Sequence, residues 1–75
     1  MIKKYVHTSK ELGENLRLIR ERHDLKQKDI AKILSLDRST YAYYETGKTL
    51  PNIFYLIKLF ETLKINFLDF IYKML

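Results

Sequence analysis

The chain has 75 residues, of which 47% are hydrophobic and 31% charged, with two glycines, one proline and no cysteine. This length holds one small core and excludes a second catalytic domain, and the composition favours packed helices over disorder or a turn-rich sheet. The net charge of +5 favours a polyanionic partner such as nucleic acid, although charge of this size also serves solubility alone.

Cysteine usage and hydropathy set the expected compartment. The lack of cysteine excludes disulfides and cysteine-based zinc sites and fits a reducing environment. The longest wholly apolar run, residues 53–57, is far below the ~20 residues of a membrane span, and the basic start of the chain lacks a signal-peptide apolar region. We therefore expect a cytoplasmic protein without a membrane partner.

Residues 1–8 show no helical period and are predicted to form an extended arm, with a short strand as the alternative. A first helix is predicted at about residues 9–23. Thr8 followed by Glu11 is a capping-box pattern, and Ser9 is a rival cap. The residues that recur on one face of this helix are Leu12, Leu16, Ile19 and His23.

The sequence Asp24-Leu25 separates this helix from a second one, predicted from about Gln27 to Leu34. Its inward residues are expected to be Ile30, Ala31 and Leu34. Ser35-Leu36 then forms a tight corner. Two short helices joined in this way, over about residues 26–46, are typical of a helix-turn-helix.

A third helix is predicted between Asp37 and Gly47. Asp37 should cap it by accepting from the backbone amides of Ser39 or Thr40, and Gly47 should end it in the left-handed conformation. The expected inward residues are Tyr41 and Tyr44.

Two further helices complete the chain. Pro51 cannot continue a helix, and Asn52 and Asn66 are predicted N-caps. The expected core stripe of the fourth helix is Ile53, Leu56, Leu59, Phe60 and Leu63, and that of the last is Phe67, Phe70, Ile71 and Met74. The predicted fold is all-α, with an arm at residues 1–8 and one domain at residues 9–75.

Over residues 12–71 the chain resembles the Cro/CI-type, or XRE-family, helix-turn-helix repressors. The matching positions are Leu25, Gln27, Ile30, Ala31, Leu34, Leu36, Arg38, Ser39, Thr40, Glu45, Gly47, Lys48 and Pro51. The resemblance implies a compact five-helix lambda-repressor-like DNA-binding domain.

Three positions depart from the family pattern. Ser35 stands where the family has glycine, and a serine with positive φ costs about 1 kcal/mol unless its hydroxyl makes a compensating bond. Tyr41 fills a slot that is normally aliphatic, and Lys26 replaces the usual serine or threonine cap. These departures bear on stability and docking angle.

The resemblance also assigns DNA contacts. Gln27, at the start of the second helix, would face a phosphate, or else be a solvated surface residue. In the major groove Arg38 could bond to guanine or to a phosphate, and Ser39 could bond to base edges. Tyr43 offers a ring to a thymine methyl, or packs on the surface. The remaining expected phosphate contacts are Thr40, Thr46 and Lys48.

Arg20 and Glu45 lie on or beside core faces, which is unusual for charged residues. The resemblance implies a partly buried ion pair that connects the first helix to the end of the third. The alternative is two separate solvated charges.

Nothing in the sequence indicates catalysis. The two histidines, His7 and His23, do not stand at ligand spacing from each other or from a carboxylate cluster, and the sequence shows no nucleophile with a positioned base and no Gly-rich phosphate loop. We expect no enzyme activity, no metal and no cofactor.

The C-terminal third carries more apolar side chains than one small core can bury. Phe54, Tyr55 and Ile57 lie off the core stripe of the fourth helix, and so do Leu68, Tyr72 and Leu75 on the last. We predict a homodimer whose interface contains Phe54, Ile57, Leu68, Tyr72 and Leu75. The alternative is burial of these residues under the arm of the same chain.

The sequence therefore predicts a sequence-specific regulator of transcription that binds double-stranded DNA, most simply a small repressor. A two-fold dimer would place its third helices about 34 Å apart on a palindromic operator. The alternative is a module with the same fold that binds a protein partner, such as an antitoxin with its toxin or a regulator with its antirepressor.

Overall fold

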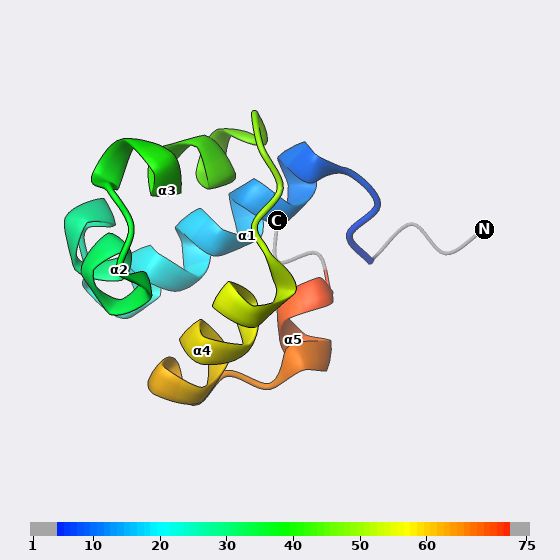
Figure 1. The fold of residues 1–75 in the computed structure, drawn as a ribbon. Helices are drawn as coiled ribbons and strands as arrows, with labels where there is room; N and C mark the ends of the chain where they lie inside the picture. The colour runs from blue at the N-terminus through cyan, green and yellow to red at the C-terminus, as the bar shows by residue number, and fades with distance from the viewer. Residues whose placement is uncertain (1–4, 73–75) are drawn as a thin grey trace.

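Five helices form the molecule in a computed structural model that describes residues 5–72. They are α1 (Ser9–Arg22), α2 (Gln27–Leu34), α3 (Arg38–Thr46), α4 (Ile53–Leu63) and α5 (Phe67–Ile71). α1 runs through the middle of the molecule, with α2 and α3 on one side of it and α4 and α5 on the other (Figure 1). This arrangement confirms the predicted all-α, five-helix fold. No helix within residues 5–72 is long and apolar enough to cross a membrane.

Three of the predicted N-caps form as expected. The Thr8 hydroxyl accepts from the Glu11 amide at 3.1 Å. Asn52 accepts from the amide of Phe54 at 2.7 Å, and Asn66 accepts from that of Leu68 at 2.8 Å. Each bond satisfies one of the amides that a helix start leaves without a partner.

The prediction for Asp37 is wrong in one respect. Asp37 does occupy the N-cap position of α3, but its side chain accepts no capping hydrogen bond from Ser39 or Thr40. Because Asp37 is exposed, water can satisfy both the carboxylate and the first amides of α3. At α2, the Asp29 carboxylate accepts from the Lys26 amide at 2.8 Å, which supplies half of a capping box where the usual cap side chain is missing.

The corner between α2 and α3 depends on a left-handed residue. Ser35 has φ 57° and ψ 42° and closes α2, as predicted from its position. Gly47, at φ 82°, ends α3 in the same region. A serine in this conformation costs more than a glycine does, because its Cβ crowds the following carbonyl oxygen.

The core lies between the packed helix pairs α1 and α3, α2 and α3, α2 and α4, and α1 and α5. Its buried members are Leu16, Ile19, Ile30, Ala31, Leu34, Tyr41, Tyr44, Leu56, Leu59, Phe60 and Phe70. Ile53 and Phe67, predicted for this core, are half exposed. Each is the first residue of its helix, where no preceding turn covers it, although the Phe67 ring still packs on Phe60. His23, predicted on the inner face of the first helix, follows the end of α1 and is exposed.

Hydrogen bonds join the end of α5 to α1 and join the arm to the end of α5. The buried Asn15 side chain donates to the carbonyls of Phe70 and Tyr72, at 2.6 and 2.9 Å. The described part of the arm is extended and forms a single antiparallel bridge between Tyr5 and Tyr72. Within residues 5–8, the strand predicted as the alternative for the arm thus amounts to a single bridge. Met74 and Leu75, placed at the end of the last helix by the sequence, lie outside the described residues, as do residues 1–4.

The backbones of α1 and α3 touch at two glycines. A Cβ on Gly13 would collide with the carbonyl oxygens of Tyr44 and Glu45, and a Cβ on Gly47 would lie 2.7 Å from the Lys10 Cα. The Ser9 hydroxyl donates to the Gly47 carbonyl at 2.8 Å. The position of α3 is therefore set by main-chain contact with α1.

Candidate nucleic-acid interface

The outer face of α3 carries the residues that the sequence assigned to base contacts. Arg38, Ser39 and Tyr43 are all exposed, while Thr40 is half-buried. Ser39 and Tyr43 are four residues apart and so share one face of the helix. The inner face holds the buried Tyr41 and Tyr44, as predicted. The exposed polar side chains of α3 thus point outward, and its two buried tyrosines pack against the core.

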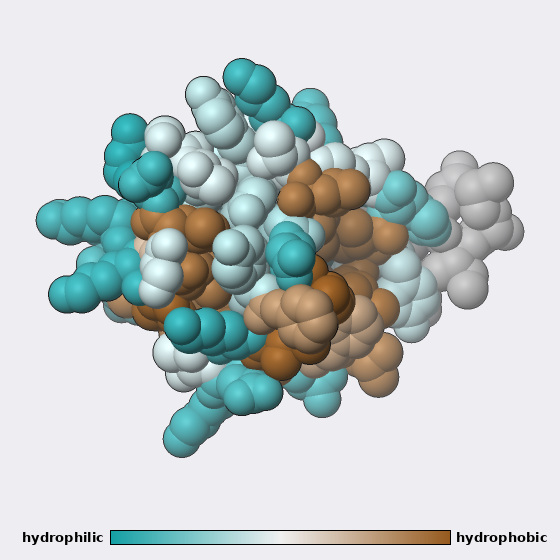
Figure 2. All heavy atoms as spheres, in the orientation of Figure 1, coloured by the Kyte–Doolittle hydropathy of each residue, from teal (hydrophilic) through white to brown (hydrophobic). Residues whose placement is uncertain are grey.

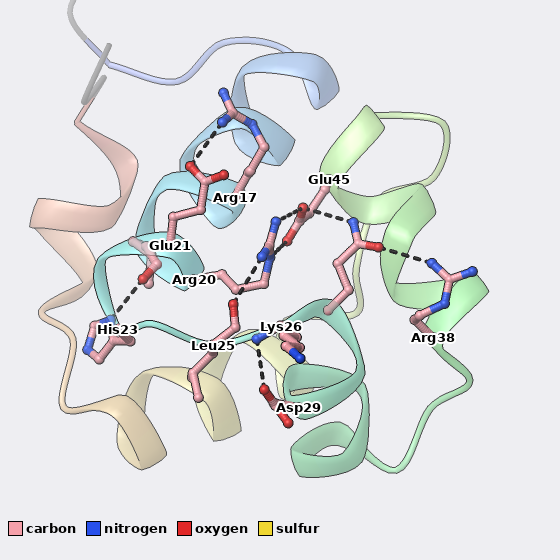
Figure 3. Close-up of polar contacts among 11 residues, drawn as sticks. Arg17, Arg20, Glu21, His23, Leu25, Lys26, Asp29, Arg38 and Glu45 are labelled. Carbon is pink, nitrogen blue, oxygen red and sulfur yellow. Dashed lines mark hydrogen bonds and ion pairs between the residues drawn. The ribbon is translucent and has the colours of Figure 1, made fainter.

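A buried ion pair connects this helix to α1. The Arg20 Nε donates to Glu45 Oε2 at 2.7 Å, and Arg20 Nη2 donates to Glu45 Oε1 at 3.1 Å (Figure 3). The two side chains are 15% and 3% exposed. Arg20 Nη1 also donates to the Leu25 carbonyl at 3.0 Å, so the same guanidinium holds the loop that leads into α2. This geometry is the fork arrangement in which arginine binds a carboxylate most strongly.

The surroundings of the ion pair shift three pKa values. Burial alone would raise the pKa of Glu45, but hydrogen bonds from Arg20 and Gln27 outweigh it, so the pKa lies below its ordinary value. The hydrogen bond to Glu45 raises the pKa of Arg20 further. Burial, reinforced by the Glu45 charge, raises the pKa of the Tyr41 hydroxyl. Arg20 and Glu45 are thus charged, and Tyr41 neutral, at neutral pH.

Gln27 extends this network to the surface. Its Nε2 donates to Glu45 Oε1 at 3.1 Å, and its Oε1 accepts from Arg38 Nη1 at 3.1 Å (Figure 3). The Glu45 carboxylate can only accept, which fixes the orientation of the amide and turns its oxygen toward Arg38. The chain of contacts runs from α1 through the buried carboxylate to the first residue of α3. The family resemblance paired Arg20 with Glu45, but the sequence did not predict that Gln27 contacts Glu45 or Arg38.

At the other end of α3, Lys48 lies over Tyr43. The Lys48 Nζ is 4.3 Å from the centre of the Tyr43 ring, within the range of a cation–π contact. The Thr46 hydroxyl donates to the Tyr43 carbonyl at 3.2 Å. Tyr43 therefore has one face of its ring against a lysine, and that lysine lies beside the exposed face of α3.

Exposed apolar side chains gather on α4 and α5, as Figure 2 shows for one face of the molecule. Of the predicted interface residues, Phe54 is 73% exposed and Leu68 64%, and Ile57 and Tyr72 are also exposed; Leu75 lies outside the described residues. Tyr5 of the arm packs edge-on against Tyr72, with the ring centres 5.4 Å apart. Residues 5–8 thus leave Phe54 and Leu68 uncovered.

The roles of two structurally important residues were not predicted from the sequence. Gly13 allows α1 and α3 to touch, and a glycine inside a predicted helix was the available signal. Asn15 stands three residues after Leu12 and four before Ile19, which places a polar side chain on the core face. A buried polar side chain needs hydrogen-bond partners, so its position indicated a tether.

Within residues 5–72 no group of three His, Asp or Glu residues is arranged to hold a metal.

Comparisons with known proteins point to one family. The helix-turn-helix model HTH_3 matches residues 16–70. A transcriptional regulator from Listeria innocua has a similar crystal structure, with a TM-score of 0.73 and 33% identity over 80% of this chain and 56% of that one. The restriction-modification controller protein C.AhdI from Aeromonas hydrophila has a TM-score of 0.74 and 27% identity, over 83% of this chain and 94% of its own. This chain thus spans little more than half of the Listeria regulator. No curated protein matches it significantly.

Proposed function

The chain belongs to the helix-turn-helix family HTH_3, and on that premise we propose that it is a sequence-specific DNA-binding regulator of transcription rather than an enzyme. The observation that carries the proposal is the outer face of α3. Its polar residues are exposed on a helix whose position is fixed by a buried ion pair and by main-chain contact with α1. A rigid helix with exposed polar side chains suits the major groove, because base edges are recognised only in a defined geometry.

In this proposal α3 lies in the major groove. Arg38, Ser39 and Tyr43 contact base edges, and Gln27 holds the Arg38 guanidinium for a two-bond contact with guanine. Lys48, Thr40 and Thr46 contact phosphates, as does the start of α2. Because the Gln27 amide already bonds to Glu45 and Arg38, we assign the phosphate at this end to the backbone amides of the first turn of α2. The net charge of +5 adds a long-range attraction.

We further propose that two copies associate through the apolar face formed by Phe54, Ile57, Leu68 and Tyr72. Exposed apolar clusters of this kind are usual at protein interfaces and costly in water. Two-fold symmetry would present two α3 helices to half-sites about 34 Å apart, so the operator is expected to be palindromic. Occupation of a promoter by such a dimer would repress transcription.

Selection of bound duplexes from a random pool tests the proposal directly. An enriched, two-fold symmetric motif is expected, and recovery of no motif would overturn sequence-specific binding. On the selected duplex, Arg38→Ala should cost about 1–3 kcal/mol and relax the preference at one base position. The matched control is Arg17→Ala, which removes a half-exposed arginine of α1 and should bind as the wild type does. Lys48→Ala should weaken binding to all sequences and lower the salt slope by about one.

The dimer has its own test. Sedimentation at micromolar concentration should give a species of twice the chain mass of 9.1 kDa, and Leu68→Glu should reduce it to a monomer. A wild-type monomer would overturn the proposed homodimer. It would then favour a different protein as the occupant of this apolar face, as in an antitoxin bound to its toxin.

A further inference from the structure

A hollow with a volume of about 210 Å³ lies between the end of α1 and the turn that joins α4 to α5. It shares no residue with the DNA contacts proposed above or with the apolar face proposed for the dimer. Three apolar side chains line it: Ile19 from α1, Ile65 from the turn and Phe70 from α5. Ile19 and Phe70 belong to the buried core, so the hollow lies against the surface of the core.

The polar lining of the hollow is mainly basic. Arg22 and Lys64 line it together with His23, and Asp69 is the only carboxylate among the lining residues. The other arginines of α1 are neutralised, since Arg17 pairs with Glu21 and Arg20 with Glu45. Within residues 5–72, neither Arg22 nor Lys64 has an ion-pair partner. Two permanent positive charges therefore face this hollow against one negative charge.

The histidine is held in one tautomer. His23 Nδ1 lies 2.8 Å from the Ile19 carbonyl oxygen (Figure 3). A carbonyl oxygen only accepts, so Nδ1 carries the hydrogen. Nε2 of the ring is then free to accept a hydrogen bond.

Lys64 occupies a conformation that a lysine does not favour. It closes α4 with φ 57° and ψ 47°, where glycine or asparagine is usual. The left-handed conformation costs a non-glycine residue stability, and strain of this kind is found preferentially at functional sites. Lys64 in this conformation is one of the residues that line the hollow.

From this arrangement we infer that the hollow binds a small organic anion, a carboxylate with a short aliphatic or aromatic body. The apolar body lies against Ile19, Ile65 and Phe70, and the carboxylate lies between Arg22 and Lys64. The size of the ligand is limited, because the hollow measures only about 210 Å³. Ordinary ligand pockets measure about 300–1,000 Å³, so nucleotides and larger cofactors do not fit.

The experiment titrates the full ¹⁵N-labelled chain, without DNA, with benzoate and with 4-methylpentanoate, and with the uncharged amide of each acid. Backbone amide signals of residues 64–70 and of residues 22–23 are expected to shift and saturate with a carboxylate. The amides should bind about tenfold more weakly, since they lose the charged hydrogen bonds but keep the apolar contacts. Because DNA is absent, the result does not depend on the proposed regulatory function.

Two variants and one control sharpen the test. Arg22→Gln and Lys64→Gly should each weaken the carboxylate about fivefold or more, since each removes one charged partner. Lys64→Gly also relieves the positive φ, so loss of binding cannot be a failure to fold. Lys28→Gln removes another exposed charge, on α2, and should change nothing. Equal affinity for the acid and its amide, the same weakening by Lys28→Gln, or no saturable shift at the solubility limit of the probe would each overturn the inference.

Discussion

Replacing Glu45 with alanine is expected to destabilise the domain severely. The carboxylate is 3% exposed and accepts two hydrogen bonds from Arg20 and one from Gln27. Its removal leaves a guanidinium that is 15% exposed without a counter-charge. Stranding one partner of a buried pair costs about 3–5 kcal/mol. A domain of this length has a total stability of only about 4–11 kcal/mol, so the variant should be loosened or unfolded at ambient temperature.

The assay is thermal and urea unfolding followed by circular dichroism. For a domain of this size 1 kcal/mol corresponds to about 4–8 °C in Tm, so a fall of at least about 12 °C is expected. Glu21→Ala is the matched control, since Glu21 pairs with Arg17 at 3.1 Å but both side chains are about half exposed. An exposed pair of this type contributes only about 0.3–0.5 kcal/mol. A Glu45→Ala variant that melted within a degree or two of wild type would refute the argument from burial.

The stability of the domain at low pH provides a second test of the Glu45 carboxylate. The pKa of Glu45 is lower in the folded chain than its ordinary value of about 4.3. In the interval between the two values the unfolded chain binds more protons, so stability rises with pH there. The contribution of Glu45 is complete above about pH 4.3 and is lost as the pH falls through the folded-state value. Glu45→Gln should therefore lose less stability than wild type on acidification, measured by urea unfolding at pH 3 and pH 7. A parallel loss in both proteins would contradict the lowered pKa.

Three other substitutions test the packing. Gly13→Ala should cost about 1–3 kcal/mol in urea unfolding because the new methyl collides with two carbonyls of α3, and an unchanged midpoint would show that the helices can separate freely. Asn15→Ala removes the donor of two carbonyls at the end of α5. In this variant the amides of residues 67–71 are therefore expected to exchange their hydrogens faster than those of residues 27–34. Ser35→Gly should stabilise the chain by about 0.5–1 kcal/mol by relieving a positive φ, whereas Ser35→Ala should not. Equal melting temperatures of the two variants would show that backbone strain at residue 35 is not the cause.

Local signals in the sequence predicted the helices well. N-caps at Thr8, Asn52 and Asn66 and the glycine at position 47 act within one turn of the chain, so their effect depends little on the rest of the fold. The same rule failed for Asp37, whose side chain is exposed and makes no capping hydrogen bond. Helical periodicity likewise identified the buried faces but not their limits: Ile53 and Phe67 have the right spacing and lie at exposed helix starts.

Long-range contacts were harder to predict. That Gln27 bonds to both Glu45 and Arg38 depends on the crossing of α2 and α3, and no local pattern contains that crossing. The tether from Asn15 joins residues 55 or more positions apart. The pairing of Arg20 with Glu45 was expected only from the family resemblance, since spacing alone left two separate charges as the alternative.

The two glycine contacts between α1 and α3 separate the position of α3 from the chemistry of its outer face. Gly13 and Gly47 fix α3 through main-chain atoms, while the outward residues Ser39 and Tyr43 take no part in that contact. Side chains on the outer face can then be exchanged without tilting the helix. If α3 binds DNA as proposed, operator preference can be altered by substitutions at Ser39 and Tyr43 while the core stays the same, whereas a change at Arg38 also affects its contact with Gln27.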